Sequence, residues 1–139
     1  MSDENSPKTR VLLVDDDVTL LDMYKERLQM AGYEVITASN GEEALGKATE
    51  TLPHVILLDV MMPKINGFDA LNILKSTTET KDIPVIILTA LTQDNHRQKG
   101  MADGASDYVV KSEAMPKEVV EKIEKVVAAR KKQLEQSAA

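Results

Sequence analysis

The segment that decides the fold is VILLDVMMP, residues 55–63. Its first four side chains are consecutive branched aliphatics, a pattern typical of a central parallel strand that is buried on both faces. Asp59 follows directly, where the strand is about to end, and Pro63 closes the loop behind it. Because a buried carboxylate without partners is costly, Asp59 must meet a cation, hydrogen-bond donors or water there. Taken alone, such a residue is more often a simple strand cap, and the rest of the chain must decide.

The composition predicts one globular domain. With 139 residues, 42% of them hydrophobic and 29% charged, the chain can bury its own core. We expect neither a membrane span nor a signal peptide, because residues 1–10 are polar and no run approaches about 20 apolar residues. The absence of cysteine excludes disulfides and thiolate metal sites and is compatible with a cytoplasmic location. A net charge of −6 argues against direct binding to nucleic acid.

Five predicted strands alternate with five predicted helices. The other strands are expected at 11–14, 33–38, 85–88 and 107–110, and the helices at about 18–31, 42–51, after Gly67, 94–102 and from Pro116 onward. This alternation predicts an α/β fold, a doubly wound parallel sheet with helices on both faces. We expect its strands to have the flavodoxin-like order 2-1-3-4-5. We expect residues 1–9 to be a flexible N-terminus, 10–128 to form the domain and 129–139 to extend the last helix and form a tail.

Chemically distinctive residues stand where four of the five strands end. They are Asp15 and Asp16, Asp59, Thr89 and Lys111. Because ligands bind beyond the carboxyl ends of parallel strands, we expect these residues to form one site. In the 2-1-3-4-5 order the acid pair and Asp59 lie on adjacent strands, about 4.8 Å apart. Lys111 lies roughly 10 Å away, a gap that its long side chain can mostly close.

This combination of groups favours phosphoryl transfer. Three carboxylates with no cysteine and no nearby histidine favour Mg²⁺, with Mn²⁺ possible, over zinc. The metal and Lys111 would neutralise phosphoryl oxygens, Thr89 would donate a hydrogen bond, and Asp59 would attack in line.

The motifs resemble those of the response-regulator receiver domain of two-component and phosphorelay signalling. The resemblance runs from about residue 10 to 127 and rests on VLLVDDD (11–17), LLDVMMP (57–63) with Gly67, ILTA (87–90) and DYVVK (107–111). It implies that Asp59 is the phosphoacceptor for a histidine kinase or phosphotransfer protein. The Mg²⁺ ligands would be Asp16, Asp59 and the Met61 carbonyl, with Asp15 acting through water.

The resemblance also implies a switch. Thr89 and Lys111 would contact the phosphoryl group, and the rotamer of Tyr108 would follow Thr89. The output face would be the fourth helix, fifth strand and fifth helix, which would meet a downstream protein target or an effector in the same chain, with homodimerisation on phosphorylation as an option. Such a domain is no enzyme beyond catalysing its own phosphorylation and dephosphorylation.

Two departures from the family pattern lead to further expectations. Ser112 stands where the family has a proline joined to the lysine by a cis bond. A cis bond to a non-proline costs about 2.5–4 kcal/mol, so we expect a trans bond or a strained cis one. Met61 and Leu91 are apolar at positions where short-lived members carry polar residues, which predicts a long-lived phosphoryl group.

Three alternatives remain at this point. Residues 11–19 also fit the signature of haloacid-dehalogenase-type phosphatases, with Asp15 as nucleophile and Asp17 as acid/base. A flavin-binding protein of similar fold should offer amides and hydroxyls after the first strand, where the acids would repel a phosphate. A phosphorylation-independent pseudo-receiver would act only by protein contact. We expect His54 and His96 at the surface, away from the acids.

Overall fold

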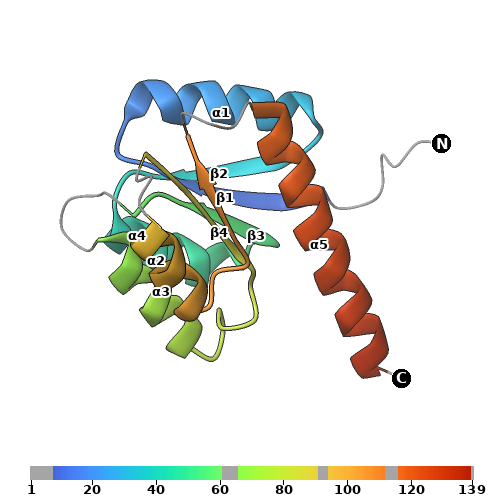
Figure 1. Cartoon of the computed structure of the whole chain (residues 1–139). Helices are drawn as coiled ribbons and strands as arrows, with labels where there is room; N and C mark the ends of the chain where they lie inside the picture. Colours follow the sequence, from blue (N-terminus) through green and yellow to red (C-terminus); the bar gives the residue numbers. More distant parts are fainter. Residues whose placement is uncertain (1–7, 61–65, 91–93, 112–115, 139) are drawn as a thin grey trace.

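A computed structural model of the chain describes residues 8–60, 66–90, 94–111 and 116–138 (Figure 1). Its strands are β1 (Arg10–Val14), β2 (Glu34–Ala38), β3 (Val55–Leu58), β4 (Val85–Thr89) and β5 (Asp107–Val110). Its helices are α1 (Val18–Met30), α2 (Gly41–Thr51), α3 (Gly67–Ser76), α4 (Asp94–Ala102) and α5 (Pro116–Ala138). Each element lies where the hydrophobic pattern predicts it, with ends that differ by a residue or two.

The strands form one parallel sheet in the order β2-β1-β3-β4-β5. The predicted fold class and strand order are therefore confirmed. The order reverses between β1 and β3, because the chain first moves outward to β2 and then returns past β1. In an open parallel sheet the crevice at this reversal is where ligands bind.

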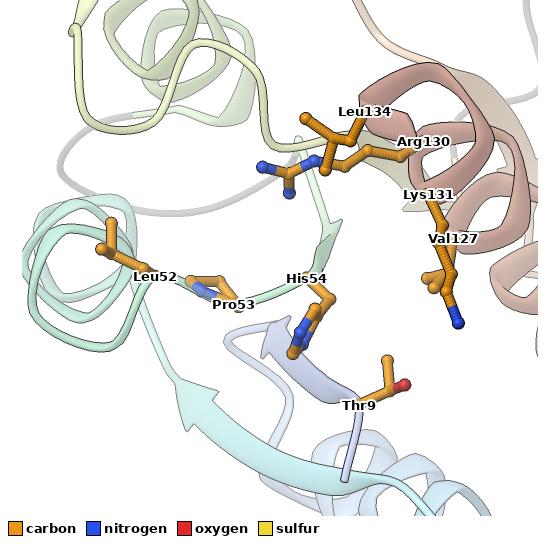
Figure 2. A pocket seen from close by; sticks show the side chains of 8 residues that line it. All are labelled: Thr9, Leu52, Pro53, His54, Val127, Arg130, Lys131 and Leu134. Carbon is orange, nitrogen blue, oxygen red and sulfur yellow. The ribbon is translucent and has the colours of Figure 1, made fainter. Parts of the chain in front are cut away.

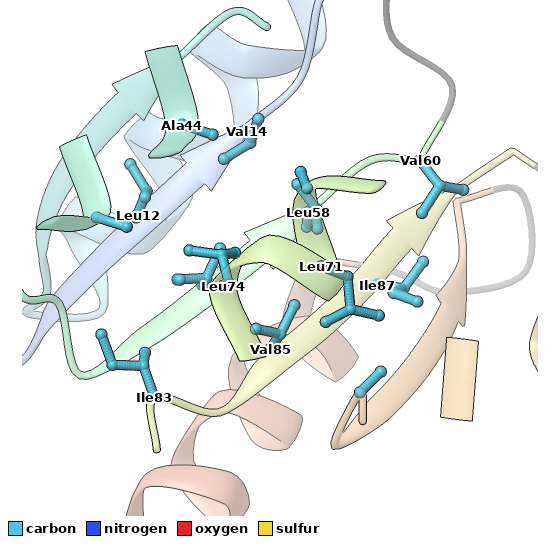
Figure 3. Close-up of a cluster of buried hydrophobic side chains, with 14 of the residues drawn as sticks. Leu12, Val14, Ala44, Leu58, Val60, Leu71, Leu74, Ile83, Val85 and Ile87 are labelled. Carbon is cyan, nitrogen blue, oxygen red and sulfur yellow. The ribbon is translucent and has the colours of Figure 1, made fainter. Parts of the chain in front are cut away.

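Helices cover both faces of the sheet, so every central strand is buried on two sides. On one face α2 and α3 pack over alternate strand residues, among them Leu12, Leu58 and Ile87 (Figure 3). On the other face α1 and α5 pack over the intervening residues, such as Leu13 and Leu57. All four residues of β3 have no exposed surface. The unbroken aliphatic run at 55–58 follows from this double burial.

The ends of α1 follow local chemistry that the sequence announces. Asp17 is the N-cap, and its Oδ1 accepts hydrogen bonds from the backbone N–H groups of Thr19 (3.0 Å) and Leu20 (3.2 Å). The helix ends before Gly32, whose φ of +97° is strained for residues with a side chain. Asp17 therefore starts the helix, and the turn into β2 needs a glycine.

The last helix, α5, is long, and its C-terminal half extends past the body of the domain (Figure 1). Its N-terminal half packs on the sheet through Val119 and Ile123, which are fully buried. None of the described helices is long and apolar enough to cross a membrane.

Candidate functional site

Backbone pairing continues one residue past three strands and brings the predicted residues to one edge. The N–H of Asp15 donates to the Ala38 carbonyl (3.1 Å), and the N–H of Asp59 donates to the Val14 carbonyl (3.1 Å). At the other side, the N–H of Lys111 donates to the Thr89 carbonyl (2.8 Å). The side chains after β1, β3 and β5 are thus held by the sheet itself. This edge is a rigid platform for chemistry.

Three carboxylates gather on this platform. One oxygen from each of Asp15, Asp16 and Asp59 lies within 4.8 Å of the others. Asp15 and Asp59 are only 3% and 4% exposed, whereas Asp16 is exposed. The cluster is closed toward the protein and open to solvent on the side of Asp16, so an ion can reach it.

Lys111 balances part of this negative charge. Its Nζ donates to Asp15 Oδ2 at 2.6 Å and to Asp59 Oδ2 at 3.0 Å, and its side chain is 13% exposed. Burial raises the pKa of Asp15, and the hydrogen bond from Lys111 only partly opposes this. Burial would lower the pKa of Lys111, but the two carboxylate hydrogen bonds outweigh it and hold that pKa above its ordinary value. The ammonium therefore remains charged between the two acids.

Thr89 and Tyr108 lie on the β4–β5 side of the site. Thr89 is fully buried at the end of β4, paired in register with Val110. Tyr108 is 3% exposed, and the Arg97 guanidinium lies 5.9 Å from its ring centroid. Burial raises the pKa of the Tyr108 phenol. The ring therefore lies inside the domain, against α4, and its hydroxyl stays protonated at neutral pH.

The structure explains why position 67 must be glycine, which the sequence motif alone did not reveal. A Cβ at this position would lie 2.3 Å from the Val60 Cα and 2.5 Å from the Asp59 carbonyl oxygen. These are backbone atoms, so they cannot rotate away. The first residue of α3 must be glycine for the helix to begin directly against the backbone that carries Asp59.

One residue near the site, Tyr24 on α1, is not among those that the sequence motifs single out. Tyr24 is 4% exposed, and burial raises its pKa, with Lys111 and Asp15 as the charges that act on it. A tyrosine among aliphatic core positions was the signal that could have pointed to a polar neighbour.

Several expectations have other outcomes. Asp17 caps α1 and does not join the acid cluster, which disfavours the acid/base role that the phosphatase alternative gives it. His54 is half-buried, its Nδ1 accepts the Arg10 N–H, and it lies away from the acid cluster. The expectations that concern Met61, Leu91 and the Lys111–Ser112 bond lie outside the described residues.

The arrangement suits a hard cation together with a phosphoryl group. Carboxylate oxygens are the ligands that Mg²⁺ and Mn²⁺ prefer, and the described residues bring no histidine nitrogen to this cluster. A buried acid flanked by an ammonium and a hydroxyl offers a nucleophile with charge compensation in place. Fold and site together are those expected of a phosphoryl-accepting signalling domain, and the acids after β1 disfavour a nucleotide or flavin phosphate there.

The chain belongs to the response regulator receiver domain family, whose profile matches residues 11–124. The probable transcriptional regulator ycf27 of Guillardia theta is 42% identical over 120 residues, 86% of this chain and 46% of that protein. The transcriptional regulatory protein CpxR of Escherichia coli (strain K12) is 46% identical over 102 residues, 73% of this chain and 42% of that protein. This chain thus spans slightly less than half the length of these curated relatives.

Solved structures agree with this family membership. Chemotaxis protein CheY4 of Vibrio cholerae superimposes with a TM-score of 0.80 at 36% identity, covering 86% of this chain and 99% of that one. The CheY-like receiver domain protein of Methanospirillum hungatei JF-1 gives 0.85 at 27% identity, covering 91% and 99%. The chain is a receiver domain of the two-component response regulators, and the alternative of a phosphatase is not favoured.

Proposed function

We propose that this receiver domain accepts a phosphoryl group on Asp59 from a histidine kinase or phosphotransfer protein and thereby switches the surface formed by α4, β5 and α5. The single observation that carries the proposal is the Lys111 ammonium, 2.6 Å from Asp15 and 3.0 Å from Asp59 at the mouth of the sheet. A structural ion pair would need one acid. Two buried acids and a third, exposed one leave a net negative site that requires a further cation.

Asp15, Asp16 and Asp59 would hold that cation, Mg²⁺ or alternatively Mn²⁺. Their oxygen donors, within 4.8 Å of one another, fit such an ion. The Met61 carbonyl is a further ligand in this proposal, although it lies outside the described residues. When bound, the ion supplies positive charge that offsets the carboxylates and the phosphoryl oxygens, which lets two anions meet.

Asp59, Lys111, Thr89 and Tyr108 have separate roles in the proposed transfer. A carboxylate oxygen of Asp59 attacks phosphorus, and the bond between phosphorus and the donor nitrogen breaks, with its electron pair leaving on the imidazole. Lys111 transfers a hydrogen bond from Asp59 to a phosphoryl oxygen, and the Thr89 hydroxyl donates to another. Tyr108 follows Thr89 and changes the shape of the α4–β5–α5 face. The domain, residues 10–128, catalyses no reaction beyond its own phosphorylation and dephosphorylation.

The changed face would contact a downstream protein target or an effector in the same chain, or a second copy of the domain. The regulators CpxR and ycf27, which are about twice as long as this chain, support a same-chain effector. A cytoplasmic location is part of the proposal and agrees with a cysteine-free chain.

Phosphorylation by acetyl phosphate tests the proposal. Wild-type protein with Mg²⁺ should gain the mass of one phosphoryl group, mapped to the peptide that contains Asp59, and should gain none in EDTA. Asp59→Asn should gain none under either condition. The matched control is Asp17→Asn, which keeps the α1 N-cap and should be labelled like wild type.

The phosphatase alternative gives the opposite pattern. Labelling that survives Asp59→Asn, maps to Asp15 and turns over continuously would overturn the proposal. A pseudo-receiver would show no labelling of the wild-type chain, although Mg²⁺ would still raise its melting temperature.

A further inference from the structure

A second pocket lies at the opposite end of the sheet from the acid cluster. Its volume is about 480 Å³, and one wall is the segment before β3, with Leu52, Pro53 and His54. The other wall is the C-terminal half of α5, and Thr9 closes the gap beside β1. Figure 2 shows Arg130 and Leu134 of α5 extending over the open space beside His54 and Pro53, whereas the Lys131 side chain points away from Arg130. The volume lies within the range of small-molecule sites.

The polar groups of this pocket are hydrogen-bond donors. The Nδ1 of His54 accepts the Arg10 N–H at 2.9 Å, so the proton of the neutral ring lies on Nε2. Burial, then the nearby Arg10 and Arg130 charges, lower the pKa of His54 and keep the ring neutral at neutral pH. Arg130 and Lys131 add two cationic groups. No carboxylate is among the residues that line the pocket.

Two buried guanidinium nitrogens at this end have no acceptor among the described residues. They are the Nε atoms of Arg130, which lines the pocket, and of Arg10, which lies beside it. The Nη2 of Arg10 donates to the Leu52 carbonyl (3.0 Å), so this guanidinium is held in place while its Nε is unmatched. Buried donors nearly always have partners in proteins, so these two unmatched cationic donors leave this end of the sheet electropositive and short of acceptors.

The rim of the pocket is apolar and locally strained. Leu52 has a φ of +46°, a conformation that leucine rarely adopts, and its side chain is 47% exposed. Leu134 on α5 is 55% exposed. Together with Val127 and Pro53, these side chains offer an apolar surface beside the cationic groups.

We propose that this pocket binds a small amphiphilic anion, with a carboxylate or phosphate head on Arg130 and His54, Lys131 adding positive charge at the rim, and an apolar body against Leu52, Val127 and Leu134. The donors match the head because arginine binds both oxyanions through paired N–H groups. The α5 residues that form the wall of the pocket all lie after residue 124, where the match to the family profile ends. The site is independent of phosphorylation.

Nuclear magnetic resonance titration of the ¹⁵N-labelled chain tests this site. Octanoate and octyl phosphate should shift the amides of residues 9, 52 and 54 and of 127–134, and octanol should not. Arg130→Met keeps the aliphatic stem and should weaken binding roughly tenfold or more. Lys132→Met is the matched control, because Lys132 is an exposed neighbour on α5 that does not line the pocket.

Three outcomes would overturn the inference. They are the absence of shifts up to the solubility limit of both anions, equal shifts with octanol, and equal affinities of the two variants. The dispersion of the Arg130→Met spectrum, compared with wild type, verifies that the variant is folded. Because Asp59 lies at the far end of the sheet, a failed titration leaves acetyl phosphate labelling unaffected, and the two proposals stand or fall separately.

Discussion

Lys111→Met should be the most damaging single change at the acid platform when no divalent cation is present. Methionine keeps most of the apolar stem but removes the ammonium that lies between Asp15 and Asp59. These acids are 3% and 4% exposed, so neither can recover its lost partner from bulk water. Removal of one member of a buried ion pair costs about 3–5 kcal/mol, and we expect a loss in the free energy of unfolding in that range.

Urea unfolding followed by far-ultraviolet circular dichroism, in EDTA at neutral pH, measures this loss. The matched control is Lys122→Met, which breaks a pair with Asp107 of similar length, 2.9 Å, between side chains that are 37% and 26% exposed. Solvent already screens that pair, so its loss should cost about 1 kcal/mol or less. Both variants remove one lysine charge, and they differ in the burial of the pair and in the number of carboxylates left behind, two for Lys111 and one for Lys122.

A double variant tests the cause of the effect. Asp15→Asn in the Lys111→Met background removes one of the two uncompensated charges and should restore part of the lost stability. The reasoning is refuted if Lys111→Met costs no more than Lys122→Met, or if the second substitution restores nothing.

Three further changes have defined outcomes. Gly67→Ala should lower the free energy of unfolding in urea by about 3 kcal/mol or more, because its Cβ would lie 2.3 Å from a backbone atom. Gly46→Ala is the control: its Cβ would lie in open space, and it should stabilise α2 by about 0.5–1 kcal/mol. Equal effects of the two substitutions would contradict this. Burial raises the pKa of Asp15 above its ordinary value of 3.8, so the folded state loses stability as the pH rises through that raised pKa and Asp15 ionises. The stability of Asp15→Asn relative to wild type should therefore increase from about pH 4 upward. A stability difference that does not change with pH would contradict this. Exposed Asp16, changed to Asn, should alter stability in EDTA by less than about 0.5 kcal/mol yet reduce the Mg²⁺-dependent rise in melting temperature, and an undiminished rise would exclude it as a ligand.

The sequence was sufficient to predict the acid platform, because the platform follows from the order and direction of the strands. Once β1, β3, β4 and β5 are recognised as parallel strands, their carboxyl ends must share one edge, and Asp59 and Lys111 follow. The side-chain period of a strand and the crossover rule are local or nearly local properties. No knowledge of packing distances is needed to bring these residues together.

The pocket at the opposite end of the sheet from the acids and the role of Gly67 could not be predicted in this way. Arg130 and His54 are far apart in the chain, and each has an ordinary explanation on its own. Their proximity depends on the direction in which α5 leaves the sheet, which side-chain packing at Val119 and Ile123 decides. The clash at Gly67 depends on how closely the start of α3 approaches the backbone that follows β3, which would put a Cβ 2.3 Å from the Val60 Cα.

The sequence by itself thus determined the fold class, the strand order and the identities of the residues at the acid platform, because hydrophobic periodicity and chain connectivity encode them. Only the tertiary structure decided that Asp15 and Asp59 share one ammonium, and that Arg130 and His54 line the same cavity. The physical reason is that charge pairing and burial depend on distances between elements, which packing sets and which no local pattern records.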